Sequence, residues 1–112
     1  TTDTAKAGEF YAKLFGWEMQ TQEMSPGKNY TSFMNQGVPV GGMLELTDEW
    51  LGAPPHWGVY FSVADLDATL AKARDMSATI MYDPISFPAV GKFTMIQDPQ
   101  GVHFSVIEFA KP

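Results

Sequence analysis

The sequence predicts an α+β fold built from two related halves, each containing one helix followed by three strands. Two amphipathic helical patterns are each followed by short runs of β-branched and aromatic residues. The order of elements repeats at an offset of 62 residues, which places Asp3 on Asp65. A β-rich run at 56–63 opens only the second half, so the first half is expected to lack its opening strand. Seven main strands and two main helices are predicted.

The first half begins with a helix pattern, because a Thr/Asp cluster can cap a helix and apolar residues then recur at helical spacing. Gly16 is expected to end this helix, since glycine readily adopts the left-handed conformation found there. Three strands should follow, separated by a turn at 25–29 and a short turn around Gly37. Their expected ranges are 17–22, 30–36 and 39–46.

A linker containing a Pro pair, residues 47–55, leads to the second half. The opening strand at 56–63 is followed by a helix at 64–76, where Leu66, Leu70 and Ala73 form one apolar stripe. Further strands are expected at 78–84, 91–97 and 102–109. The segment 85–91 should form a loop, and "DPQG" at 98–101 should form a tight turn.

Composition excludes several classes of protein. A length of 112 residues with 45% hydrophobic residues fits one domain with a single core. The net charge of −6 disfavours nucleic acids and anionic membrane surfaces as partners, because both attract clustered Lys and Arg. No apolar run reaches membrane-spanning length. The absence of cysteine excludes disulfides and thiolate ligands, and it fits the cytoplasmic location that we expect.

Three stretches carry a family resemblance: "FYAKLFGWEM", "HWGVYFSVADLDATLAKA" and "IQDPQGVHFSVIEF". On these stretches, the chain resembles the vicinal oxygen chelate superfamily. This superfamily includes glyoxalase I, extradiol dioxygenases and bleomycin-resistance proteins. Within it, the chain is most similar to an uncharacterised glyoxalase/bleomycin resistance/dioxygenase-like subgroup. The resemblance implies paired βαβββ modules in a single domain over 1–112. Its first, incomplete module would cover 1–46 and its second 56–112. This fold supports many reactions, so the resemblance alone does not assign one.

The resemblance also implies where a divalent metal would bind. Metal-using members place His or Gln on the first and fifth strands and a carboxylate on the fourth and eighth, all facing into a cup. The matching positions here are Glu45 on the fourth strand, Gly58 on the fifth and Ser105 on the eighth, seven residues after Asp98. The first position has no counterpart. Since a divalent ion needs several converging donors, we expect no cofactor at the usual site, and whether the protein is an enzyme stays open.

Side-chain alternation indicates what the cup would contain instead. On the last strand, His103, Ser105 and Ile107 share the inward face, and Glu108 faces away. Tyr60 shares the inward face of its own strand with Gly58. The resemblance adds two residues from the seventh strand and Glu45 from the fourth. The predicted ligand-binding residues are therefore Glu45, Tyr60, Phe93, Met95, His103 and Ser105, and the expected ligand is a small organic molecule.

Two other functions stay open. A displaced metal site built from Glu45, His56 and His103 would support a lyase, isomerase or dioxygenase, because carboxylate and imidazole groups bind zinc, nickel or iron. Alternatively, the chain could be a half-assembled module whose function lies in a longer parent chain or in a dimer. An unpaired strand edge tends to recruit another chain, so we expect a homodimer. No motif for a serine hydrolase, a phosphate-binding loop or a dinucleotide site is present.

Overall fold

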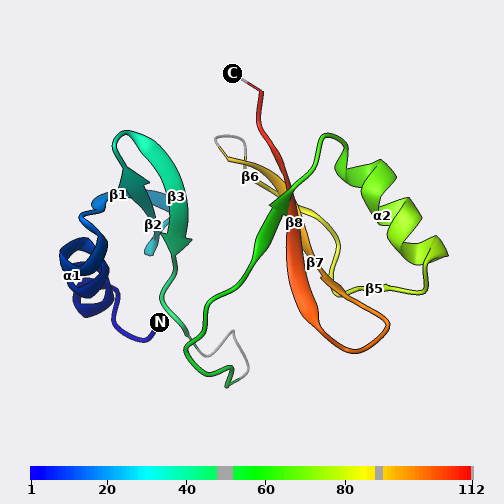
Figure 1. The fold of residues 1–112 in the computed structure, drawn as a ribbon, viewed down its shortest axis with the longest axis horizontal. Helices are drawn as coiled ribbons and strands as arrows, with labels where there is room; N and C mark the ends of the chain where they lie inside the picture. The colour runs from blue at the N-terminus through cyan, green and yellow to red at the C-terminus, as the bar shows by residue number, and fades with distance from the viewer. Residues whose placement is uncertain (48–51, 88–89, 112) are drawn as a thin grey trace. The chain divides into compact units, whose positions relative to one another are not determined.

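The computed structural model describes residues 1–47, 52–87 and 90–111. The chain divides into two compact units, residues 1–56 and 57–112, and each contains one main helix and one sheet (Figure 1). The α+β class predicted from the sequence is confirmed. No helix in the described part of the chain is long and apolar enough to cross a membrane.

Helix α1 of the first unit, Thr4–Phe15, begins and ends as the sequence predicts. The Asp3 carboxylate accepts a hydrogen bond of 2.9 Å from the Lys6 backbone N–H, which satisfies one free donor of the first turn. Gly16 adopts a left-handed conformation with φ of 73°, and its N–H donates to the Ala12 carbonyl at 2.8 Å. Both ends of α1 are therefore fixed by local sequence.

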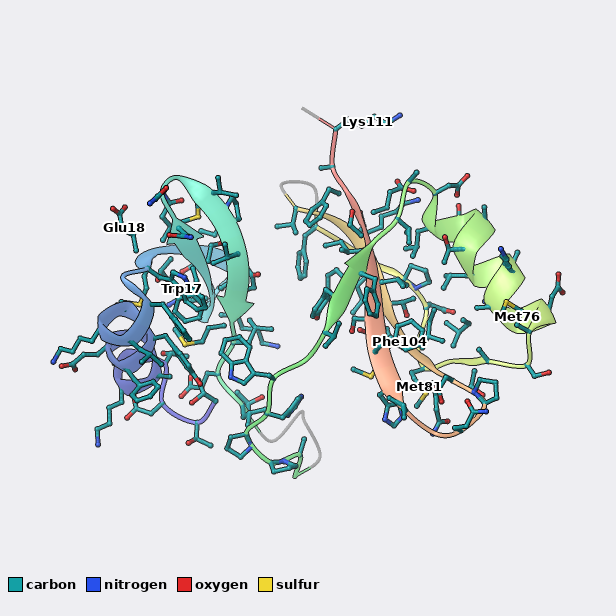
Figure 2. The ribbon with its side chains drawn as sticks, in the orientation of Figure 1. Trp17, Glu18, Met76, Met81, Phe104 and Lys111 are labelled. Atoms are coloured by element: carbon teal, nitrogen blue, oxygen red, sulfur yellow. The ribbon has the colours of Figure 1, made fainter. Side chains whose placement is uncertain are left out.

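Strands β1 (Glu18–Ser25), β2 (Lys28–Asn35) and β3 (Val38–Met43) form an antiparallel sheet in chain order. Helix α1 packs on one side of this sheet around Phe33, which is 1% exposed. The Trp17 ring lies 4.6 Å from that of Phe15 and 5.3 Å from that of Phe33, measured between centroids (Figure 2). Aromatic rings therefore pack around Phe33, with Phe15 at the exposed edge of this cluster.

The second unit contains β4 (Tyr60–Ser62), α2 (Leu66–Asp75), β5 (Thr79–Ile80), β6 (Ile85–Phe87), β7 (Gly91–Gln97) and β8 (His103–Phe109). Its sheet has the order β4-β8-β7-β5, with β6 also paired to β7. The β4–β8 pair is parallel and the other pairs are antiparallel. Parallel pairing requires a crossover connection, and α2 is part of it.

The core of the second unit lies between α2 and one side of this sheet. Leu66 and Leu70 from α2 pack with Ile96 of β7 and Val106 of β8, and all four are at most 3% exposed. Asp65 caps α2 as Asp3 caps α1, with its carboxylate accepting from the Ala68 N–H at 3.0 Å. Among the described residues of the second unit, no helix covers the side of the sheet opposite α2, and we call this side the open face.

Several strand boundaries differ from prediction. The run 56–63 gives only the three residues of β4, because pairing to β8 extends over Tyr60–Ser62 alone. The run 78–84 gives only Thr79 and Ile80, the two residues paired with β7. The expected loop 85–91 contains β6, which pairs with the start of β7. Eight strands, rather than seven, therefore occur among the described residues, and part of the expected linker, 48–51, lies outside them.

Candidate ligand-binding face

The strand register places five of the six predicted ligand-binding residues on the open face of the second unit. Ser105 of β8 lies directly opposite Tyr60 of β4 on one side and Met95 of β7 on the other. Phe93 and His103 share this side, since they differ from Met95 and Ser105 by two positions along their strands. Directly opposed residues have Cβ atoms about 4.5–5.5 Å apart. These side chains therefore form one continuous surface across three strands.

Aromatic rings extend this surface from β4 to β6. The rings of Tyr60 and Phe93 meet edge to face at a centroid distance of 6.2 Å. On the other side of Phe93, the Phe87 ring is stacked at 5.7 Å with an interplanar angle of 26°. The sequence-based prediction does not include Phe87 in the site, because its segment is expected to form a loop. The alternation of Ile85 and Phe87 before a proline was the signal that could have identified it.

Ser105 is the buried polar group at the centre of the open face. The residue is 3% exposed, and its neighbour Ile107 is 6% exposed. Within the described ranges, no hydrogen bond is made by the Ser105 hydroxyl, although its backbone N–H donates to the Val59 carbonyl at 2.9 Å. Fully enclosed polar side-chain atoms in the described residues all have partners. The Ser105 hydroxyl therefore keeps access from the open face and can donate or accept one bond there.

The open face carries no Asp, Glu, Lys or Arg among its described strand residues. His103 lies exposed at its rim, opposite Gln97. The charged groups of β7 and β8 project to the α2 side, where Lys92 Nζ lies 3.9 Å from both Asp67 and Glu108 oxygens. The site is therefore apolar and nearly neutral, with hydroxyl and imidazole groups as its polar features.

Tyr82 is a further candidate that the sequence reasoning missed. Burial raises the pKa of its phenol, and the nearby Tyr60 phenol raises it further. Its backbone carbonyl accepts a hydrogen bond of 2.6 Å from the Thr94 hydroxyl, which holds the segment after β5 against β7. Tyr82 therefore stays a neutral hydrogen-bonding group well above physiological pH.

Glu45 and His56 belong to the first unit. Glu45 is exposed and follows β3. Thr1 donates to the Leu44 carbonyl and accepts from the Leu46 N–H, which places Glu45 opposite Thr1 in a parallel pair. Alternation from the buried Met43 then puts Glu45 on the α1 side of its sheet. This pairing does not support a place in the cup, so the role of Glu45 stays a prediction.

The second unit shows the same pattern at Glu108. Val63 donates to the Ile107 carbonyl, so Glu108 occupies the position that corresponds to Glu45. Its carboxylate faces α2 and accepts from the Leu66 N–H at 2.9 Å. On this register, the position in the first unit that corresponds to Ser105 is Gly42. A Cβ atom at Gly42 would collide with the ring and hydroxyl of Tyr30, which lies over it.

The donor set does not fit a divalent metal. Gly58 has no donor, and the Ser105 hydroxyl is neutral, so neither replaces the imidazole or carboxylate expected at these positions. In the described ranges, no three His, Asp or Glu side chains converge to hold an ion. The His56 Nδ1 atom instead lies 2.7 Å from the Pro54 carbonyl, and the ring is exposed. The displaced site at Glu45, His56 and His103 is therefore not favoured.

Two hollows in the second unit lie away from the predicted residues. One of about 640 Å³ lies at the edge strand β5 and is lined by Arg74 and residues 78–83. A smaller one, about 230 Å³, is lined by residues 86–87, 91–92 and 108–111. Both are shallow and open to solvent, and only the second touches the aromatic surface, at Phe87. The open face is therefore a surface within its unit and not an enclosed cavity.

Comparison with known proteins identifies relatives over nearly the whole chain. The family model described as "Glyoxalase/Bleomycin resistance protein/Dioxygenase superfamily" matches residues 1–106. "Putative glyoxylase CFP32" of Mycobacterium tuberculosis is 38% identical over 88% of this chain. The anthracycline biosynthesis protein DauV of a Streptomyces species is 25% identical over 93% of the chain. The chain spans 37% and 42% of the lengths of these two relatives.

Solved structures resemble the fold at lower sequence identity. A hypothetical protein, BH1468 of Bacillus halodurans, superposes with a TM-score of 0.77 at 12% identity, covering 100% of this chain and 90% of that one. Methylmalonyl-CoA epimerase of Mycobacterium tuberculosis gives a TM-score of 0.75 at 18% identity, covering 99% and 83% of the two chains. These similarities support the fold and do not assign an activity.

Proposed function

Because the chain belongs to the glyoxalase/bleomycin resistance protein/dioxygenase superfamily, we propose that it binds a small organic molecule on the open face of its second unit, without a metal. One observation carries this proposal: Tyr60, Phe93, Met95, His103 and Ser105 share one helix-free side of the sheet. An apolar surface with a few convergent polar groups is typical of small-molecule sites.

The metal-free part of the proposal rests on the chemistry of the donor positions. Gly58 and Ser105 replace the two second-unit ligands that the family uses, so too few donors remain to replace the water shell of an ion. Metal analysis of protein purified without chelator tests this directly. We expect less than stoichiometric metal. Stoichiometric zinc, nickel, iron or manganese that is lost in His103→Ala would contradict the proposal.

The ligand-binding part can be tested at Gly58. A Cβ atom placed there meets open space, so a larger side chain can be accommodated without a clash in the fold. Gly58→Trp should therefore fold normally and fill the room that a bound molecule needs. A thermal-shift screen of both proteins against cationic antibiotics and aromatic metabolites provides the measurement. A compound that stabilises both proteins equally binds elsewhere and would argue against this face.

The remaining parts of the proposal concern assembly and location. The two units would be the halves of one domain, and two chains would pair as a homodimer. Support comes from apolar side chains at the edge strand β4, where Tyr60 is 52% and Phe61 is 56% exposed. Sedimentation at micromolar concentration should show a dimer, and a stable monomer would contradict it.

A cytoplasmic location fits the cysteine-free sequence and can be tested by fractionation.

A further inference from the structure

The open face has two features that restrict the chemistry of its ligand: a band of aromatic rings and the accessible hydroxyl of Ser105, which has no hydrogen-bond partner within the described residues. The band consists of Tyr60, Phe93 and Phe87, with consecutive centroids 6.2 and 5.7 Å apart. These rings come from three different strands and are fixed by the sheet register. Aromatic side chains have few rotatable bonds, so these rings offer rigid apolar contacts with little ordering cost.

Ser105 supplies the second feature. Its hydroxyl lies among Tyr60, Met95 and Ile107, and it has no hydrogen-bond partner within the described residues. The hydroxyl stays accessible on an otherwise buried residue, so water or a bound molecule can pair with it. A neutral oxygen on a bound molecule would meet this hydroxyl directly. A fully apolar molecule would instead cover the hydroxyl and leave it unsatisfied.

Charge restricts the ligand further. The strand residues of the open face include no Asp, Glu, Lys or Arg in the described ranges, and the nearest charged cluster, Lys92 with Asp67 and Glu108, lies on the α2 side. An anionic group placed against these rings would lose its hydration without gaining a counter-ion. A neutral ligand is therefore favoured over an anionic one.

We infer that the ligand is a neutral, planar aromatic molecule whose hydroxyl or carbonyl oxygen hydrogen-bonds to Ser105 while its ring lies against Phe93 and Tyr60. The inference rests on the proposed function and narrows it from any small organic molecule to one class. A ring flanked by Phe87, Phe93 and Tyr60 gains offset-stacked or edge-to-face contacts that a saturated ring of the same size cannot make.

The test uses 2-naphthol as the probe, with decahydro-2-naphthol as a saturated control and 2-naphthoate as a charged control. Dissociation constants come from amide chemical shifts in NMR titrations of the whole chain, which also show where each compound binds. We expect 2-naphthol to shift amides of β4, β7 and β8 and to bind at least tenfold more tightly than either control. Equal binding of decahydro-2-naphthol at these strands would overturn the aromatic assignment and leave the proposed function standing.

Variants separate the roles of the rings and the hydroxyl. Ser105→Ala should weaken 2-naphthol binding by about three- to tenfold, the range expected for one hydrogen bond. Phe93→Leu should weaken it by about tenfold and reduce the preference over decahydro-2-naphthol. Phe61→Leu is the matched control, because Phe61 faces the α2 side opposite Val106, and it should change binding by less than twofold. An unchanged affinity in both Ser105→Ala and Phe93→Leu would overturn the inference.

If neither naphthol shifts amides of the open face, the aromatic inference is wrong. The thermal-shift screen with Gly58→Trp then decides separately whether the proposed function survives with another ligand class. Thermal unfolding of each variant shows that the protein is folded, so a loss of binding is not mistaken for a loss of structure.

Discussion

The two units share a scaffold and differ in the sheet side away from the helix. Each has a helix capped by an aspartate, Asp3 or Asp65, and a last strand with a parallel backbone partner. In the first unit, the row across the helix-free side is Gln20, Ser32 and Gly42. In the second, the corresponding residues of the last two strands are Met95 and Ser105.

This difference is the reason why the proposed ligand site is assigned to the second unit. The helix-free side of the first unit presents amide, hydroxyl and carboxylate groups together with Met34 and the Tyr30 ring, which lies over Gly42, the position equivalent to Ser105. The open face of the second unit presents three aromatic rings around the Ser105 hydroxyl and has no carboxylate on its described strand residues. The two halves therefore share a backbone scaffold, and the proposed binding function depends on side chains of the second half alone.

The largest expected effects come from the two cores. Phe33→Ala in the first unit should lower the free energy of unfolding by about 3–5 kcal/mol, and Leu66→Ala in the second by about 2–5 kcal/mol, because both side chains are fully buried. Urea denaturation provides the measurement. Phe10→Ala is the control, since Phe10 is 58% exposed and should cost less than about 1 kcal/mol. A loss below about 1 kcal/mol in either core variant would contradict the assigned packing.

The equivalence of Gly42 and Ser105 predicts a smaller, specific effect. Gly42→Ser copies the residue of the second unit into the first, where its Cβ atom would collide with Tyr30. We expect a cost of about 1–3 kcal/mol, as for overpacking elsewhere. The cost should fall below about 1 kcal/mol when Tyr30 is also replaced by Ala, as measured by a double-mutant cycle. The same cost in both backgrounds would show that the backbone at Gly42, and not Tyr30, limits the site.

Local sequence signals predict the helices and most strands, whereas the lengths of short strands depend on which strands they pair with. The start of the first helix after Asp3 and the faces of β8 follow from capping and alternation, which depend on neighbouring residues only. The second helix, expected at 64–76, covers Leu66–Asp75 with Asp65 as its cap. The length of β4 and the existence of β6 depend on which residues of β8 and β7 lie beside them. Apolar composition alone therefore predicted a strand at 56–63 that was too long.

The candidate site shows the same limit. Tyr60, Met95 and Ser105 could be grouped from alternation and family resemblance, because the register of one sheet brings them together. Phe87 contributes through a strand that the sequence did not reveal. The lone hydroxyl of Ser105 could not be predicted either, since hydrogen-bond satisfaction depends on three-dimensional neighbours and not on residue type.

Replacing the carboxylates Glu108 and Glu45 tests whether equivalent positions of the two units play the same structural role. The expected change in the free energy of unfolding is moderate. Glu108 accepts the Leu66 N–H at the start of α2, so Glu108→Ala should cost about 1–2 kcal/mol of unfolding free energy. Glu45 holds the equivalent position but is exposed, and Glu45→Ala should cost less than about 0.5 kcal/mol. Urea denaturation of both variants measures the difference. An equal loss of unfolding free energy in the two variants would mean that Glu45 also stabilises the start of its helix, as Glu108 does.

The smallest expected effect concerns Tyr82 at alkaline pH. Burial first, and the Tyr60 phenol second, raise the pKa of Tyr82 above its usual value of 10.0. The folded protein therefore holds this proton more tightly than the unfolded chain. Stability from this group is fully present below about pH 10 and is lost as the pH rises through the higher folded-state pKa.

Tyr82→Phe should remove this contribution, so its stability should fall less steeply above pH 10 than that of the wild type, with little difference at pH 7. Urea denaturation from pH 8 to pH 11.5 measures the two slopes. Tyr60→Phe is the informative companion, because it removes the secondary cause while burial of Tyr82 persists, and it should reduce the slope only in part. Identical alkaline slopes in wild type and Tyr82→Phe would mean that the Tyr82 phenol titrates as it does in the unfolded chain, and that burial does not raise its pKa in the folded protein.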